Sequence, residues 1–232
     1  SSIVITMLPD DEAVEKVVNE VIGKSLLSKD SIFVDMSSTK YESAKLFYSN
    51  LKKTNVHFVD APVSGGPEGA KSATLAIMAG GDADTFEKIK NILKTMGNPT
   101  LVGPSGSGQV AKLCNQIIVG VTIGAVAEAV ILCEQVGANP ENFIKAVAGG
   151  FADSKILQNH GARMIKKDFA PRGKSITHLK DMDNILKCAK DANISLPISK
   201  LIQSMYQNIV DRGQGNDDHS ALYKEILEQN KK

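Results

Sequence analysis

The sequence predicts a chain of two halves, an α/β half over residues 1–104 and an all-helical half over residues 105–232. Up to residue 103, short β-branched runs alternate with helical patterns, an order typical of a mostly parallel sheet flanked by helices. Beyond the glycine-rich segment 103–108, helical patterns follow one another without a convincing strand pattern. The composition agrees with a globular protein, because 42% of the 232 residues are hydrophobic and 23% are charged.

Each strand of the first half is predicted from a short run of β-branched and other apolar residues. The first run, Ile3–Leu8, is continuous, as in a strand that is covered on both faces. Pro9–Glu12 suits the first turn of a helix, where a missing N–H costs nothing and the helix dipole favours acidic groups. The other expected strands lie at 31–35, 56–60, 74–79 and 100–102, with helices over 14–22, up to about 52, and over 82–96.

The second half is expected to contain only helices. Its most apolar run, Ile117–Cys133, is interrupted by Thr122 and Glu128, whereas a membrane span needs about 20 largely uncharged residues. We therefore predict a buried helix of a soluble protein, with Gly120 and Gly124 on a face that another helix can approach closely. The six expected helices lie at 109–136, 140–149, 154–166, 176–192, 197–211 and 217–230.

The charge balance argues against several classes of partner. Lys and Arg total 27 against 26 Asp and Glu, so a net charge of +1 predicts no attraction to nucleic acid or to an anionic membrane. Cys114, Cys133 and Cys188 are too far apart for a disulfide framework, which favours buried thiols in a reducing compartment. With no signal-peptide pattern, we expect the cytoplasm, or the mitochondrial matrix in a eukaryote.

The segment Asp60–Gly66 follows the third expected strand, and ligands of open α/β sheets bind beyond the carboxyl ends of strands. Ser64 offers a hydroxyl group, and Gly65 and Gly66 offer backbone N–H groups with no side chain in the way. Together they predict a cradle for a carboxylate. The alternative is an ordinary glycine-rich turn.

A second candidate opens the long apolar helix. Lys112, Asn115 and Gln116 are spaced i, i+3 and i+4, so they project from one helix face. A lysine beside an apolar helix body is partly desolvated, which fits it for proton transfer. The alternative is a solvated lysine near the start of a helix. The run is not a Walker A loop, because no Lys-Ser or Lys-Thr follows its last glycine.

Other charged and metal-binding residue types give weaker signals. Lys180 and Asp181 lie within a helical pattern and by themselves resemble a common surface pair. The basic stretch 163–180 is either a phosphate-binding surface or a solvated helix face. We expect no metal site, because the four histidines lack the spacing of metal ligands. The segment Asp217–Ser220 is typical of an N-terminal cap for the last helix.

In this order, the motifs resemble those of the β-hydroxyacid dehydrogenase family, which includes 3-hydroxyisobutyrate dehydrogenase and 2-hydroxy-3-oxopropionate reductase. The resemblance covers essentially all 232 residues, and Asp218–Leu222 is more similar to the reductase branch. The matching segments are Thr6–Pro9, Asp35–Ser38, Asp60–Gly66, the Gly-x-Gly-x-x-x-Lys run ending at Lys112, and Lys180-Asp181.

The resemblance implies the C-terminal portion of a Rossmann-type parallel sheet followed by an all-helical domain that begins with a long interdomain helix. It implies hydride transfer between NAD or NADP and a small β-hydroxy acid or its semialdehyde, in a homodimer or homotetramer. Lys112 would donate the proton to the aldehyde oxygen, or accept it in the reverse direction. Ser64, Gly65 and Gly66 would hold the substrate carboxylate, Asn115 or Gln116 would bond the reacting oxygen, and Leu8, Pro9, Ser38 and Lys180, supported by Asp181, would contact the cofactor.

The chain departs from the family pattern at three places. Gln116 stands where several members have asparagine, and Gly173 stands where many have an aromatic residue two positions after the proline matching Pro171. The glycine-rich phosphate-binding turn of a Rossmann domain does not precede Ile3, and roughly 60 residues of two βαβ units would be needed to supply it. A polypeptide of these 232 residues alone is therefore expected to bind neither nicotinamide and to lack dehydrogenase activity, while the full-length protein has both.

A function from another class is also compatible with the sequence. A non-catalytic binding or oligomerisation module could keep the family fold without turning over substrate. Lys112 and the Ser-Gly-Gly turn favour an enzyme, and the missing glycine-rich phosphate-binding turn favours the non-catalytic module. A cofactor-dependent absorbance change with small semialdehydes separates the two.

Overall fold

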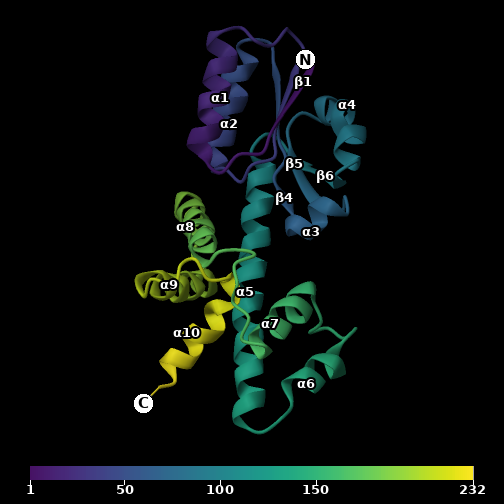
Figure 1. The fold of residues 1–232 in the computed structure, drawn as a ribbon. Coiled ribbons are helices and arrows are strands. Elements are labelled where there is room, and N and C mark those ends of the chain that lie inside the picture. The colour runs from purple at the N-terminus through teal and green to yellow at the C-terminus, as the bar shows by residue number, and fades with distance from the viewer. Residues whose placement is uncertain (232) are drawn as a thin grey trace. The chain divides into compact units, whose positions relative to one another are not determined.

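The computed structural model describes residues 1–231 and contains two compact units, Ser1–Asn115 and Gln116–Lys232 (Figure 1). The first unit holds the strands, and the second holds helices. Both units share the long helix α5 (Ser107–Gln135), which starts in the first and continues in the second. The boundary expected at residues 104 and 105 lies just before this helix and stays a prediction.

The first unit alternates strands with helices, as the sequence predicts. Asp10 caps its first helix, because its carboxylate accepts a hydrogen bond from the Ala13 N–H at 2.9 Å. The strands are β1 (Ile3–Thr6), β2 (Ile32–Asp35), β3 (His57–Asp60), β4 (Val63–Ser64), β5 (Leu75–Gly80) and β6 (Gly97–Gly103). The helices are α1 (Asp11–Gly23), α2 (Tyr41–Lys52), α3 (Gly66–Lys71) and α4 (Ala83–Lys94).

The described strands form one mixed sheet in the order β1-β2-β3-β5-β4, with β6 paired to β5. β1, β2 and β3 are parallel, and so are β5 and β6, but β5 is antiparallel to β3 and β4. The expected mostly parallel sheet is therefore confirmed, with the exception that β5 runs antiparallel to β3 and β4. The link from β4 to β5 contains only α3, which is too short for the crossover that a parallel pair needs.

The two faces of the sheet are covered by different helices. Phe33 and Phe58 pack with residues of α1 and α2, and their neighbours Val34 and Val59 point to the opposite face, against α4. β1 lies at the edge of the sheet, and Ile5 is 40% exposed. The prediction that the first strand is covered on both faces holds only in part, because Ile3 packs against one cluster and Val4 against the other, but both stay half-buried.

Within residues 116–231, the regular elements of the second unit are all helices or helical turns, joined by loops. Proline stands at the start of two of its helices, where its missing N–H costs nothing, and Asn139 caps the first of them through the Asn142 N–H. Besides α5, its helices are α6 (Pro140–Val147), a π-helical turn η1 (Leu157–Gly161), α7 (Ala162–Ile165), α8 (Ser175–Asp191), α9 (Pro197–Asp211), a 3₁₀ turn η2 (His219–Ala221) and α10 (Leu222–Gln229).

Helix α5 is buried on one face only. A Cβ atom at Gly120 would lie 2.6 Å from His178 Nε2, and one at Gly124 would lie 2.9 Å from Ile202 Cδ1, so α8 and α9 occupy the small-residue face as predicted. On other faces Ile118 is 65% exposed and Leu132 is 63% exposed, so the prediction of a wholly buried helix is wrong there. By length and composition alone α5 could cross a membrane, but the core helix of a soluble protein passes the same test.

The three cysteines also differ from expectation. Cys114 is exposed, and Cys133 and Cys188 are partly buried. The expectation of buried thiols is therefore wrong for Cys114, which lies on α5 three residues before Ile117 on the partly exposed first half of the helix.

Candidate active site

The carboxyl ends of β1 and β2 bring the predicted cofactor-side residues together. The Leu8 N–H donates to Ser37 Oγ at 2.8 Å, and Ser37 N–H donates to Asp35 Oδ1 at 3.1 Å. Leu8 and Ser38 are half-buried, whereas Pro9 is exposed, as is the apolar Met7 at 56%. An exposed apolar surface beyond parallel strands fits the flat rings of a dinucleotide.

The Ser-Gly-Gly segment forms a turn that sequence patterns did not resolve into elements. Ser64 ends β4 and is half-buried, and the exposed Gly65 and Gly66 lead into α3. Gly65 has φ +140° and Gly66 has φ +64°, a backbone that residues with a Cβ atom rarely adopt. The turn therefore requires these glycines and leaves their backbone open to a ligand.

Lys112 lies beside this turn. Its Nζ atom donates to the carbonyl oxygen of Val63 at 2.9 Å, and Val63 directly precedes Ser64. The Lys112 side chain is half-buried. A cationic nitrogen is thus held next to a hydroxyl group and two open glycines, and this arrangement fits a proton donor beside a carboxylate cradle.

Asp60 is a buried carboxylate that the sequence motifs contain but that we assigned no role. Its side chain accepts hydrogen bonds from the N–H groups of Gly106 at 2.7 Å and Gln109 at 3.0 Å, at the start of α5. Burial raises the pKa of Asp60 to about 6, although these backbone donors act to lower it. The signal that could have found it is an acidic residue closing an otherwise apolar strand.

Two further predicted residues meet in the second unit. Gln116 Nε2 donates to Asp181 Oδ2 at 2.6 Å, which joins α5 to α8. Lys180, next to Asp181, is exposed. Asn115 lies on α5 one residue before Gln116, at the end of the first unit, and is half-buried.

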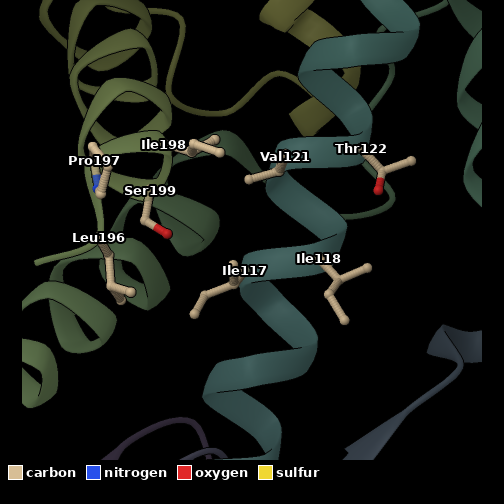
Figure 2. A pocket seen from close by; sticks show the side chains of 8 residues that line it. All are labelled: Ile117, Ile118, Val121, Thr122, Leu196, Pro197, Ile198 and Ser199. Carbon is tan, nitrogen blue, oxygen red and sulfur yellow. The ribbon is translucent and has the colours of Figure 1, made fainter. Parts of the chain in front are cut away.

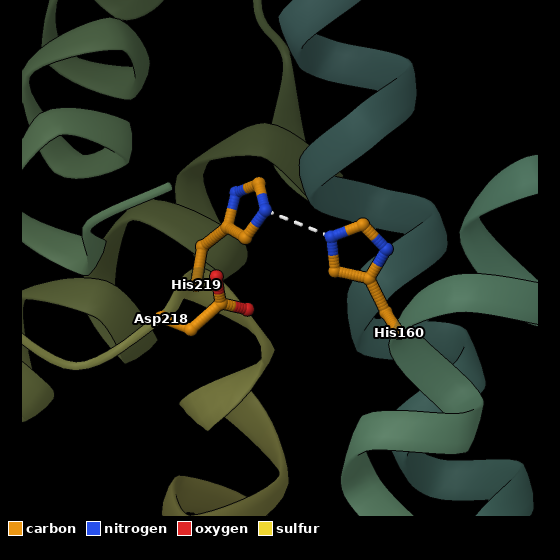
Figure 3. A group of neighbouring side chains, drawn as sticks. All are labelled: His160, Asp218 and His219. Atoms are coloured by element: carbon orange, nitrogen blue, oxygen red, sulfur yellow. Dashed lines mark hydrogen bonds between the residues drawn. The ribbon is translucent and has the colours of Figure 1, made fainter. Parts of the chain in front are cut away.

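A histidine pair and an aspartate form a second polar cluster (Figure 3). His160 Nε2 and His219 Nε2 are 2.8 Å apart and share a hydrogen bond, and Gly173 packs against the His219 ring. The ligand atoms of His160, Asp218 and His219 lie within 4.8 Å of one another, a closeness that sequence spacing did not reveal.

The Asp218 carboxylate is occupied by donors from its own chain. Oδ1 accepts from the Ser220 N–H and Oγ, so Asp218 caps the 3₁₀ turn η2 and not the last helix, for which the cap was predicted. Oδ2 accepts from the N–H groups of Arg172 and Gly173. Burial would raise the pKa of Asp218, but the hydrogen bonds from Ser220 and Gly173 and the nearby His219 lower it to about 2. The cluster is thereby explained as a structural network around an anion.

The histidine pair makes the second unit sensitive to acid. Burial lowers the pKa of His160 to about 4, and His219 and Arg163 add repulsion. Since the pKa in the unfolded chain is about 6.5, the unfolded chain binds the proton first, and stability falls as the pH drops from about 6.5 to 4. Relative to His160→Phe, the wild-type free energy of unfolding should fall by roughly 2–3 kcal/mol over that window.

Urea unfolding of both proteins at pH 7 and pH 4.5 measures this difference. Titration of Asp60 cancels because both proteins contain it. An equal difference between wild type and His160→Phe at both pH values would contradict the assignment.

An apolar pocket of about 360 Å³ lies between α5 and the start of α9 (Figure 2). Its described lining contains no charged side chain, so it does not suit a carboxylate substrate. The lining residues are Ile117, Ile118, Val121, Thr122, Leu196, Pro197, Ile198 and Ser199.

Comparison with known proteins identifies two family domains. The NAD-binding domain of 6-phosphogluconate dehydrogenase matches residues 1–120, and the NAD-binding domain of NADP-dependent 3-hydroxyisobutyrate dehydrogenase matches residues 106–226. Together the two matches extend from residue 1 to residue 226, so both units are accounted for.

Full-length relatives agree with these matches. The 2-hydroxy-3-oxopropionate reductase of Escherichia coli is 40% identical over 97% of this chain and 78% of its own length. The mitochondrial 3-hydroxyisobutyrate dehydrogenase of Drosophila melanogaster is 32% identical over 96% of this chain and 71% of its own. The solved 3-hydroxyisobutyrate dehydrogenase of Mycobacterium tuberculosis with L-serine has a TM-score of 0.88 at 26% identity, covering 97% of this chain and 79% of its own. The chain therefore belongs to the β-hydroxyacid dehydrogenase family, whose members are NAD(P)-dependent oxidoreductases of small β-hydroxy acids or their semialdehydes.

Proposed function

We propose that the full-length protein reduces 2-hydroxy-3-oxopropionate, with 3-hydroxyisobutyrate and its semialdehyde as the alternative substrate pair. The observation that carries the proposal is the position of Lys112, whose Nζ lies 2.9 Å from the carbonyl oxygen that directly precedes the Ser64-Gly65-Gly66 turn. A short 3-oxo acid presents both groups that this arrangement matches, a carboxylate for the turn and an aldehyde oxygen for the lysine. The 40% identity to a reductase of this acid supports the choice.

The chain's own residues bind the acid and move the proton. The hydroxyl group of Ser64 and the N–H groups of Gly65 and Gly66 hold the substrate carboxylate. The Lys112 ammonium group donates its proton to the aldehyde oxygen as this becomes an alkoxide, and accepts it in the reverse direction. A bound NADH or NADPH supplies the hydride, held at Leu8, Pro9 and Ser38 beyond the ends of β1 and β2.

The two neighbouring carboxamides take different roles in this proposal. Gln116 is engaged with the Asp181 carboxylate of α8, and so it orients the turn of α8 that carries Lys180. We assign the bond to the reacting oxygen to Asn115, which lies on α5 three residues after Lys112 and so shares a helix face with it. Lys180 contacts a cofactor phosphate, because its exposed cationic side chain is the type of group that binds anions.

The decisive experiment is an absorbance assay at the nicotinamide band. The full-length protein is used, because this chain spans 78% of the length of the E. coli reductase. Oxidation of NADH or NADPH with 2-hydroxy-3-oxopropionate supports the proposal, and preference for the semialdehyde of 3-hydroxyisobutyrate supports the alternative pair. Cofactor binding without turnover of any small semialdehyde would favour a non-catalytic module.

Ser64→Ala should weaken substrate binding while leaving the cofactor site intact. The variant loses one hydrogen bond to a carboxylate, which is worth about 1.5–3 kcal/mol, so KM should rise about tenfold or more. Steady-state kinetics with each substrate varied in turn measure the effect. A normal substrate KM together with a raised cofactor KM would assign Ser64 to the other ligand.

We further propose that the helical half assembles the chain into a homodimer or homotetramer. Gly120 and Gly124 cannot carry this, since the chain's own α8 and α9 cover them. The support comes from exposed apolar residues, including Leu132 at 63% on α5 and Leu201 at 60% on α9, and from the small net charge of +1.

Sedimentation at micromolar concentration is expected to show a multiple of the 24.8 kDa protomer, and Leu132→Glu should shift it toward the monomer. A single 24.8 kDa species for the unaltered chain would refute the assembly. For location, we propose the cytoplasm, or the mitochondrial matrix in a eukaryote, as the relatives from E. coli and Drosophila suggest.

A further inference from the structure

Gln109 is a buried carboxamide on the first turn of α5, and both ends of its amide are bonded to one loop. Its side chain is 1% exposed. Oε1 accepts from the Thr39 N–H at 3.1 Å, and Nε2 donates to the Ser37 carbonyl oxygen at 2.9 Å. Gln109 is separated from these groups by 70 and 72 positions in the sequence, so the bonds join two distant parts of the first unit.

The two bonded groups flank Ser38. In a parallel sheet, one residue forms its two backbone hydrogen bonds with the residues that flank its counterpart on the neighbouring strand. The Gln109 amide bonds to Ser37 and Thr39 in the same pattern, so it takes the place of a strand neighbour for this loop. Ser37 in turn accepts the Leu8 N–H at 2.8 Å through its Oγ. The single amide of Gln109 thereby fixes the loop that carries Ser38 and, through Ser37, the loop that carries Leu8.

The same turn of α5 is fixed to the sheet by Asp60. The Gln109 N–H itself donates to Asp60 Oδ2 at 3.0 Å, so backbone and side chain of this residue are both held. Lys112 follows three residues later, about 4.5 Å along the helix axis. The distance between the Ser38 loop and the Lys112 side chain is therefore set by one short rigid segment.

We propose that Gln109 is a positioning residue, which holds the cofactor-side loop Ser37–Thr39 at a fixed place relative to Lys112. The inference rests on the proposed roles of Lys112 and Ser38. An apolar side chain of the same length would fill the space equally well, but it would leave the Ser37 carbonyl and the Thr39 N–H without their buried partner. The amide is needed because it offers a donor and an acceptor at once.

The first test replaces Gln109 by methionine in the full-length protein. The affinity for the nicotinamide cofactor, followed by its fluorescence on binding, should fall about tenfold, because the loop is no longer preorganised. Amide exchange of Thr39 without cofactor should become faster, since its acceptor is lost. The substrate KM, measured at saturating cofactor, should change less than threefold.

Gln109→Glu gives a conservative counterpart with its own signature. The ionised carboxylate keeps the acceptor for Thr39 but places an oxygen against the Ser37 carbonyl oxygen. Once protonated, it can again donate, so its cofactor affinity relative to wild type should recover as the pH falls. A constant ratio between pH 8 and pH 5 would contradict this role of the donor.

Thr85→Val is the matched control, because Thr85 is 2% exposed in the same unit and its Oγ1 pairs with His57 Nδ1 at 3.3 Å, away from the loop. It should lower the melting temperature without weakening cofactor binding. If Gln109→Met lowers cofactor affinity no more than Thr85→Val does, Gln109 is merely structural. Fluorescence titration measures cofactor binding and does not need turnover. A Lys112→Ala variant that keeps its activity would refute the proposed role of Lys112 as the acid. The effect of Gln109→Met on cofactor affinity would still test the positioning role of Gln109 separately.

Discussion

Replacement of Lys112 by alanine is expected to lower kcat by about 10²–10⁴-fold, the usual effect of removing a general acid. Without the ammonium group, the alkoxide that forms on hydride addition has no proton donor positioned beside the turn. The fold should persist, because the Lys112 side chain is only half-buried and its loss opens no cavity in the apolar core. Stopped-flow or steady-state turnover and a thermal melt give the two quantities.

Two comparisons make this result specific to proton transfer. Lys90→Ala removes a partly exposed lysine paired with Glu87 on α4, and it should leave kcat unchanged. Added small primary amines should restore part of the turnover of Lys112→Ala, and the rate should follow the amine's basicity. Turnover within a factor of a few of wild type would show that another group supplies the proton.

Gly108→Ala should lower the free energy of unfolding by about 2–4 kcal/mol and reduce turnover as well. A Cβ atom at Gly108 would lie 2.4 Å from the Met78 carbonyl oxygen and 2.6 Å from the Asp60 carbonyl oxygen. Both are backbone atoms of paired strands and cannot move aside cheaply. The first turn of α5 must then shift away from the Asp60 carboxylate, and Lys112 shifts with it.

Gly23→Ala provides the control, because Gly23 ends α1 and a Cβ atom there would meet nothing within 4 Å. It should be neutral or stabilise the protein by a few tenths to 1 kcal/mol, since alanine restricts the unfolded chain. Urea unfolding of both variants measures the difference. If Gly108→Ala and wild type have the same free energy of unfolding, the close packing of Gly108 against the backbone of β3 and β5 is contradicted.

Most elements could be predicted from local patterns. Apolar spacing and Pro197 predicted helix α9 with its observed bounds, and short β-branched runs predicted β2 and β3 to within a residue. β4 and α3 were missed, because a two-residue strand and a six-residue helix are too short to show periodicity. The antiparallel direction of β5 was missed with them, since it depends on how few residues connect it to β4.

The candidate site divides in the same way. The motifs around Ser64 and Lys112 are local, so the sequence was enough to single them out, and the structure places the Lys112 amine against the residue before Ser64. Asp60 was only part of a motif, because the N–H groups that it accepts from are 46 and 49 positions away. The same holds for His160 and His219, whose contact spans 59 positions.

What the sequence alone determined is therefore the order of the elements, the two kinds of architecture and the residue types that carry the chemistry. Each of these follows from side chains within one or two turns of each other, where spacing dictates which face they share. Only the tertiary structure decided that Asp60, Gly108 and Gln109 hold α5 to the sheet and to the Ser37–Thr39 loop. Periodicity records that a residue is buried but not against which partner, and a hydrogen bond between distant segments exists only once the chain has packed.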